Sequence, residues 1–178
     1  MADAGTPKLT PHVISVLVEN EFGTLANITN LIAARGFNIE SLTVGPTHEP
    51  SISRITLVVK GGGTMIEQVQ KQLAKLIEVI EIKDLTEAGG FLSRELMLIK
   101  VGCDAGNRVE ILNIGEMFKA KAIDYTPGTI TFEIVGPPER LDNFITFLRG
   151  YGITEMARSG AVGLGRGAES LQAEYASN

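Results

Sequence analysis

The residues that could do chemistry gather in one turn near the N-terminus, between an apolar run and a helical pattern. The apolar run 13–18 ends in the polar segment 19–21, and Gly23 precedes a helix that is expected to begin near Thr24. A strand that leads into a helix through a glycine turn leaves several backbone N–H groups unpaired and directed outward. The positive end of the helix dipole lies behind these groups and favours a bound carboxylate. The turn therefore predicts a site for a small anion.

Other reactive side chains do not assemble into a catalytic or metal site. Glu19 and Glu21 could form an acid/base pair, but no histidine, lysine or thiol stands near them, which favours solvated turn carboxylates. His12 and His48 lie far apart, without the spacing of metal ligands. Cys103 is the only cysteine, so neither an internal disulfide nor a thiol metal cluster can form. Because no nucleophile, base and oxyanion site come together, we expect a chain that is not an enzyme by itself.

Composition and charge exclude several classes of function. The 178 residues are 44% apolar and 21% charged, which is ordinary for a protein with a packed core. A net charge of -5 argues against a nucleic-acid or anionic-membrane surface. No apolar stretch approaches the roughly 18 residues that span a bilayer. The first eleven residues resemble neither a secretory signal nor a transit peptide, so a cytoplasmic location is expected.

Hydrophobic patterns in the first half predict the elements that position the turn. Helical spacing follows the turn and stops at Gly36. Strands are predicted over 37–44, 54–60 and 80–83, and a helix before the last of them opens on a capping box from Thr64 to Glu67. The order is therefore β-α-β-β-α-β.

The same order recurs after a linker candidate at 87–90. An apolar strand over 96–101 leads to a helix that opens at Asn107 with a second capping-box pattern. Two short strands flank the turn 125–128, a helix follows, and a last strand is expected within 153–164.

These patterns predict an α+β protein made of two ferredoxin-like βαββαβ domains in tandem. The expected domain limits are 12–86 and 94–165, with flexible termini at 1–11 and 166–178. Domains of this size have thin cores and open sheet edges, so we expect a homodimer.

Six segments together carry a family resemblance, at 15–25, 35–47, 71–77, 84–86, 94–101 and 157–160. They resemble the regulatory (small) subunit of acetolactate synthase, also called acetohydroxyacid synthase. The resemblance covers roughly Val13 to Arg166, and its most specific string is Asn38-Ile39-Glu40-Ser41-Leu42-Thr43-Val44-Gly45-Pro46-Thr47. Phe22 departs from the proline or serine expected in the turn, which could alter the shape of the pocket or the preference for the effector.

The resemblance implies that the first domain is an ACT domain, the βαββαβ module that binds amino acids in metabolic regulation. It also implies a homodimer with two ACT sheets side by side and the effector between them. The implied effector-binding residues are the turn of one chain and a segment that includes Asn38 of the opposite chain: Asn20, Phe22, Gly23, Thr24, Leu25, Asn38 and Ile39.

A catalytic partner is implied as well. The large subunit of this family carries thiamine diphosphate, magnesium and FAD, and condenses pyruvate with pyruvate or 2-oxobutyrate. None of these cofactors is expected in this chain. The chain would activate that partner and confer feedback inhibition by valine or another branched-chain amino acid in branched-chain amino acid biosynthesis. Its preferred effector stays open, because one methyl group is worth only about 1–3 kcal/mol in a pocket.

Three alternative functions are open to a chain with these patterns. A free-standing ACT-domain amino-acid sensor would share the turn but should lack the second half of the chain. An acylphosphatase-like enzyme would need an arginine in its phosphate loop, whereas the turn offers acids. An RNA-binding sheet would need exposed aromatic side chains and basic charge, and the chain is acidic with 6% aromatic residues.

Overall fold

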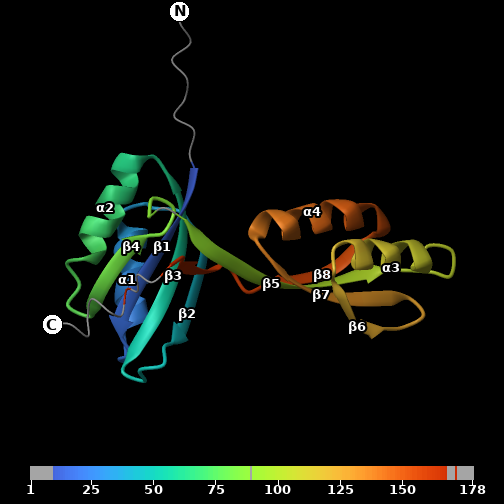
Figure 1. The fold of residues 1–178 in the computed structure, drawn as a ribbon, viewed down its shortest axis with the longest axis horizontal. Coiled ribbons are helices and arrows are strands. Elements are labelled where there is room, and N and C mark those ends of the chain that lie inside the picture. The colour runs from blue at the N-terminus through green and yellow to red at the C-terminus, as the bar shows by residue number, and fades with distance from the viewer. Residues whose placement is uncertain (1–9, 89, 168–170, 172–178) are drawn as a thin grey trace, which may run out of the picture. The chain divides into compact units, whose positions relative to one another are not determined.

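The protein is described by a computed structural model that covers residues 10–88, 90–167 and 171. It divides into two compact units (Figure 1). Unit 1 contains the described residues up to Leu92 together with those from Gly163 onward, and unit 2 is Ser93–Val162. Each unit contains the βαββαβ order, so the α+β class and the tandem ferredoxin-like folds predicted from the sequence are confirmed.

Unit 1 is a four-stranded antiparallel sheet with two helices on one face (Figure 1). The sheet order β2-β3-β1-β4 places β2 and β4 at the edges. The core lies between the helices and the inner face of β1 and β3, where branched aliphatic side chains alternate with the pleat. The elements are β1 Thr10–Glu19, α1 Thr24–Ala34, β2 Ile39–Pro46, β3 Ile52–Gly61, α2 Gly63–Leu73 and β4 Val79–Asp84.

Unit 2 repeats this plan with the sheet order β6-β7-β5-β8. Its core includes Phe132 of the sheet and Phe144 of a helix, whose rings meet edge to face with centroids 5.6 Å apart. The elements are β5 Phe91–Gly102, α3 Arg108–Met117, β6 Lys121–Tyr125, β7 Thr129–Gly136, α4 Pro138–Leu148, the 3-10 turn η1 Arg149–Tyr151 and β8 Ile153–Arg158.

The outer face of the unit 1 sheet, opposite its helices, is covered by the chain after unit 2. A short strand, β9 Val162–Gly165, pairs with β5. The N–H of Gly163 donates to Oγ1 of Thr56 at 3.4 Å, and a Cβ at Gly163 would lie 2.8 Å from a methyl group of Leu85. Leu171 is buried against Leu17 and Ile52 of the same face. Unit 1 is therefore completed by residues that follow unit 2 in the sequence.

Several local predictions differ from the structure. Helix α2 begins at Gly63 after Gly62 and has no side-chain cap, so the capping box at Thr64 is wrong. Glycine is itself a tolerated N-cap residue, and here it starts the helix before Thr64. Asn107 is the N-cap of α3, but its Oδ1 accepts the N–H of Asp104 instead of a helical N–H.

The chain ends also differ from the predictions. The last strand expected within 153–164 is two strands, β8 and β9. Strand β1 starts at Thr10 and Leu171 is buried, whereas the expectation of flexible termini at 1–11 and 166–178 stays a prediction. The other residues of the predicted termini lie mostly outside the described part of the chain. The domain limits 12–86 and 94–165 stay predictions.

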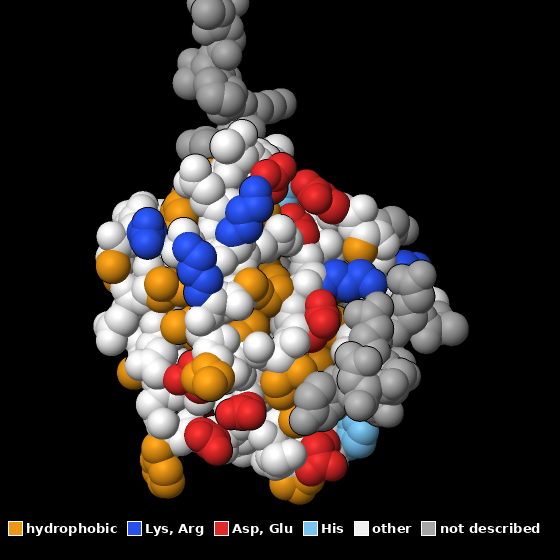
Figure 2. Space-filling model, turned by 90° about the vertical axis from the view of Figure 1, so that its left-hand side faces the viewer, with side chains coloured by type: hydrophobic (Ala, Val, Ile, Leu, Met, Phe, Trp, Pro, Cys, Tyr) orange, Lys and Arg blue, Asp and Glu red, His pale blue; other side chains and the backbone are white. Residues whose placement is uncertain are grey.

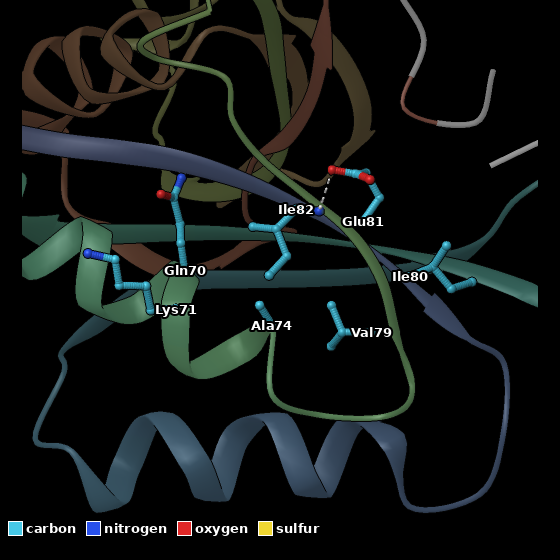
Figure 3. A pocket seen from close by; sticks show the side chains of 7 residues that line it. All are labelled: Gln70, Lys71, Ala74, Val79, Ile80, Glu81 and Ile82. Carbon is cyan, nitrogen blue, oxygen red and sulfur yellow. Dashed lines mark hydrogen bonds between the residues drawn. The ribbon is translucent and has the colours of Figure 1, made fainter. Parts of the chain in front are cut away.

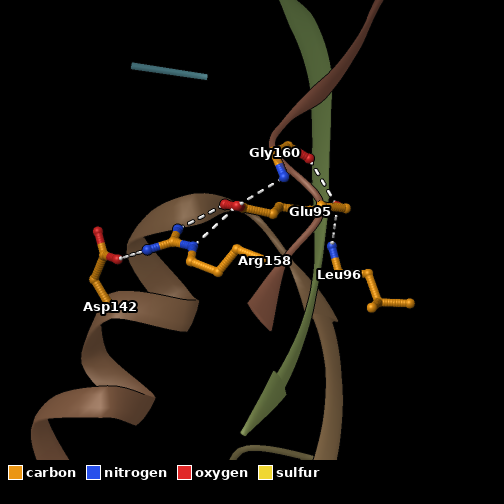
Figure 4. Close-up of polar contacts among 6 residues, drawn as sticks. Glu95, Leu96, Asp142, Arg158 and Gly160 are labelled. Carbon is orange, nitrogen blue, oxygen red and sulfur yellow. Dashed lines mark hydrogen bonds and ion pairs between the residues drawn. The ribbon is translucent and has the colours of Figure 1, made fainter. Parts of the chain in front are cut away.

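A charge network around the buried Glu95 ties three elements of unit 2 together (Figure 4). Arg158 of β8 donates to both carboxylate oxygens of the buried Glu95 of β5, at 2.9 and 2.6 Å, and to Oδ1 of Asp142 of α4 at 2.6 Å. Glu95 also accepts the N–H of Gly160 at 3.2 Å. The hydrogen bond to Glu95 is the main cause that raises the pKa of Arg158 above its ordinary value. The network fixes the start of the connection between β8 and β9.

Candidate functional site

The predicted anion turn has the geometry that the sequence indicated. Helix α1 begins at Thr24, and its N-cap residue Gly23 has a φ of 91°, which favours glycine. Thr24 N–H contacts the carbonyl of Glu21 at 3.4 Å, and Asn27 N–H donates to the carbonyl of Gly23 at 2.9 Å. Among the described residues, this leaves the backbone N–H groups of Leu25 and Ala26 without an acceptor. These groups point out of the helix start with the positive end of its dipole.

A side-chain hydroxyl adds a third unsatisfied group at the same place. Thr24 is buried, with 5% of its surface exposed, and its Oγ1 has no hydrogen-bond partner among the described residues. Buried polar groups are rarely left unpaired in folded proteins, so each exception needs an explanation. Because Gly23 offers no capping side chain, an external acceptor such as a carboxylate could satisfy these donors.

The turn is held in place by two neighbouring loops. Asn20 donates through its backbone N–H to the carbonyl of Ser51 at 2.7 Å and through Nδ2 to the carbonyl of Pro50 at 2.9 Å. Glu19 N–H donates to the carbonyl of Glu78 at 2.9 Å. Asn20 therefore orders the turn from behind, while the helix start faces outward.

Phe22 and Leu25, the two apolar residues of the predicted site, are exposed. Phe22 has no contact that covers it, with 109% relative exposure, and Leu25 is 42% exposed. Both side chains are thus available to a bound molecule beside the helix start.

Asn38 and Ile39 lie at the other end of unit 1. Ile39 pairs with Val59 of β3, and Val59 pairs with His12 near the beginning of β1, whereas the turn follows the end of β1. Within one chain, the structure therefore brings the five turn residues together and leaves Asn38 and Ile39 apart from them. Asn38 is exposed, and Ile39 begins the edge strand β2.

A cavity of about 400 Å³ lies elsewhere on unit 1 (Figure 3). Its lining comes from α2 and β4 and includes none of the predicted site residues: Gln70, Lys71, Ala74, Val79, Ile80, Glu81 and Ile82. Glu81 accepts the N–H of Ile82 through Oε1 at 3.3 Å. The carboxylate of Glu81 therefore lies on the edge strand β4. A charge on an edge strand discourages pairing with a further strand.

One group of titratable side chains was not expected from the sequence. Nδ1 of His12 lies 2.7 Å from Oδ2 of Asp84, both residues are buried, and Glu87 offers a third ligand atom within 4.8 Å. The two residues are 72 positions apart, so local spacing could not indicate the pair. Asp84 also accepts the N–H of Thr86 at 2.8 Å. Because hydrogen bonds already satisfy the buried pair, we assign it a structural role between β1 and β4.

No helix in the described part of the chain is long and apolar enough to cross a membrane.

Unit 1, with its βαββαβ order and its glycine turn before α1, has the architecture of an ACT domain. The family profile described as "AHAS small subunit-like ACT domain" matches residues 14–81, and the profile "Small subunit of acetolactate synthase" matches residues 94–167. The chain belongs to the acetolactate synthase small-subunit family.

Relatives of this family match both units. The "Acetolactate synthase small subunit" of Aquifex aeolicus is 46% identical over 156 residues, which are 87% of this chain and 81% of that protein. The small subunit of Mycolicibacterium smegmatis is 44% identical over 169 residues, 95% of this chain and 97% of that protein. The crystal structure of the small subunit from Thermotoga maritima superposes with a TM-score of 0.83 at 36% identity and covers 90% of this chain and 100% of that one.

Proposed function

We propose that this chain is the regulatory subunit that activates the catalytic large subunit of acetolactate synthase and confers feedback inhibition by valine or another branched-chain amino acid. The observation that carries the effector site is the set of unsatisfied donors at the start of α1. The N–H groups of Leu25 and Ala26 and the buried hydroxyl of Thr24 converge on one helix end. An amino-acid carboxylate would supply the acceptors that these donors lack.

The placement of Asn38 supports a site shared by two chains. Strand β2 is an edge strand of unit 1, a position that suits pairing with the β2 strand of a second copy. A twofold axis would make that pairing antiparallel and would set the beginning of one β2 beside the end of the other. The end of β2 lies on the same side of unit 1 as the effector turn, because Pro46 pairs with Ser53 near Asn20. In such a homodimer, Asn38 of one chain approaches the turn of its partner.

The chemistry of the holoenzyme is assigned to the partner. We place thiamine diphosphate, magnesium and FAD in the catalytic large subunit and give this chain a non-catalytic role in the cytoplasm. The relatives named above match both units over most of their length, which supports a subunit of this enzyme over a free-standing ACT-domain sensor.

The effector site is tested by replacing Gly23 with aspartate. The added carboxylate would repel the effector and crowd its position, which removes charge-assisted hydrogen bonds worth about 1.5–3 kcal/mol each. Valine inhibition of the reconstituted enzyme should be lost while activation is retained. Gly23→Asn is the matched control, because asparagine has the same shape without the charge and tolerates a positive φ. Its loss of inhibition should be smaller. Wild-type sensitivity to valine in Gly23→Asp would place the site elsewhere.

A further inference from the structure

Three connections meet at one end of unit 1 and form a single surface. They are the segment 19–25, the loop 47–51 and the connection 74–78, and we name this surface the acidic tip. Asn20 donates to the carbonyls of Pro50 and Ser51, and the N–H of Glu19 donates to the carbonyl of Glu78 at 2.9 Å. The hydrogen bonds join the three connections, so side chains far apart in sequence project from one ordered surface.

Large apolar side chains stand exposed on this tip. Phe22 at 109% and Ile77 at 91% are the two most exposed large hydrophobic residues of the described chain, and Leu25 lies beside them. Figure 2 shows hydrophobic side chains that protrude at the lower end of this face, next to acidic ones. Scattered apolar residues on a surface are ordinary, but two that are almost fully exposed on one ordered tip make that tip a candidate interaction surface.

The charges around these apolar side chains have one predominant sign. The tip carries four carboxylates, on Glu19, Glu21, Glu49 and Glu78. Its only cationic or titratable basic side chains are Lys75 and His48. Nζ of Lys75 bonds to Gln72 at 3.4 Å, so this lysine is directed along its own helix end. An apolar centre with a charged rim is the usual anatomy of a protein interface.

We propose that the acidic tip is the docking surface for the catalytic subunit, which would present an apolar pocket rimmed by lysine or arginine. This inference rests on the proposed function and names the surface through which activation is transmitted. A second copy of this chain fits poorly, because a tip-to-tip contact would oppose the same carboxylates, and like charges across an interface are costly. The dimer through β2 leaves the part of the tip around Ile77 free, since Ile77 precedes the opposite edge strand β4.

The position of the tip also explains how an effector could change activation. The segment 19–25 carries both the exposed Phe22 and two of the three unsatisfied donors at the start of α1. An amino acid bound at those donors contacts the same segment that docks the partner, so effector and partner influence one another's affinity through a shared element.

The test uses the full chain with its cognate catalytic subunit. Ile77→Ser and Glu21→Lys each change the tip, one in its apolar centre and one in its rim. Val109→Ser and Glu116→Lys are matched controls on α3 of unit 2, where Val109 is 66% exposed. The chain is titrated into the catalytic subunit at low and high salt, and the concentration that gives half-maximal activation is measured. Valine binding by calorimetry and oligomeric state by light scattering are measured on the same samples.

Both tip variants should raise the half-maximal concentration about tenfold or more, as expected for central interface residues. Ile77→Ser should keep valine affinity and dimeric state unchanged, and Glu21→Lys should weaken the salt dependence of activation.

Unchanged activation by both tip variants, with normal activation by the wild-type chain, would overturn the tip as docking surface and leave the proposed function intact. Loss of the dimer in Ile77→Ser would also overturn it, by showing a contact between copies. A wild-type chain that fails to activate would instead refute the proposed function itself.

Discussion

Replacement of Arg158 by methionine should destabilise unit 2 strongly, because the change leaves a buried carboxylate without its cation. Glu95 is 6% exposed and receives two hydrogen bonds from Arg158, at 2.9 and 2.6 Å. After the replacement, its one remaining donor among the described residues is the N–H of Gly160 at 3.2 Å. Removing one partner of a buried ion pair typically costs about 3–5 kcal/mol.

The second ion pair of Arg158, with Asp142, allows a comparison between an exposed and a buried carboxylate. Its other partner, Asp142, has a side chain that is 61% exposed, so water replaces the lost contact in Asp142→Asn. Exposed pairs contribute only about 0–1 kcal/mol. The structure therefore predicts a loss several times larger for Arg158→Met than for Asp142→Asn. Glu95→Gln combined with Arg158→Met removes both charges and should recover part of the loss.

Urea unfolding measures the difference. Two of the three tyrosines, Tyr125 and Tyr151, belong to unit 2, so tyrosine fluorescence reports mainly on that unit. With a slope of about 1–3 kcal/mol per molar urea, a loss of 3–5 kcal/mol lowers the midpoint by roughly 1 M or more. Equal midpoints for Arg158→Met and Asp142→Asn would refute the argument, because burial of Glu95 would then have no energetic weight.

Three further changes have defined outcomes. Asn38→Ala should raise the dissociation constant for valine in calorimetry at an unchanged melting temperature, and an unchanged constant would mean that Asn38 serves only its own strand. Gly163→Val should cost about 1–3 kcal/mol in urea unfolding, because its side chain would overlap the buried leucine beneath it; Gly165→Ala has open space around it and should cost less. The hydrogen bond from Lys100 holds the pKa of Glu155 below its ordinary 4.5, so this pair stabilises the fold above pH 4.5 and the contribution is lost as pH falls through the lowered pKa. In Lys100→Met, an NMR titration should show the pKa of Glu155 rise toward 4.5, and no change would show that the pair does not form in solution.

Elements defined by local pattern could be predicted from the sequence. Gly36 ends the first helix with a φ of 70°, as expected of a helix stop, and Pro137 is the N-cap of α4. The last strand is split at Gly160, which has a φ of 81° and lies within a stretch of mixed polar and apolar residues without clear alternation. A turn of this kind depends on tertiary bonds to Glu95, which no local pattern contains.

The cover on the outer face of unit 1 could not be located from the sequence, although one signal for it existed. Strand β1 is apolar from Val13 to Val18 apart from Ser15, and such a run indicates a strand that is covered on two sides. The pattern of β1 shows that another segment packs on the outer face of the sheet. It cannot show that this segment contains Gly163 and Leu171.

The candidate site also has one part that could be predicted from the sequence and one part that could not. The glycine turn before α1 is a local pattern that the sequence predicts, whereas the distance of Asn38 and Ile39 from that turn follows from the pairing of strands in the sheet. Ile77 carried no signal, since an isoleucine in a connection looks like any other apolar residue until the three connections are seen to meet.

The return of the chain to unit 1 has a consequence for the order of folding. Domains generally fold as units during synthesis, with the N-terminal one first. Here unit 2 is one continuous stretch, Ser93–Val162, whereas unit 1 needs Gly163 and Leu171, which are synthesised after it. Unit 2 can therefore fold before Gly163 and Leu171 cover the sheet of unit 1. Until then, Leu17 and Ile52 of the nascent chain are exposed to solvent. Chaperones would therefore bind the sheet of unit 1 rather than the sheet of unit 2, although unit 1 is synthesised first.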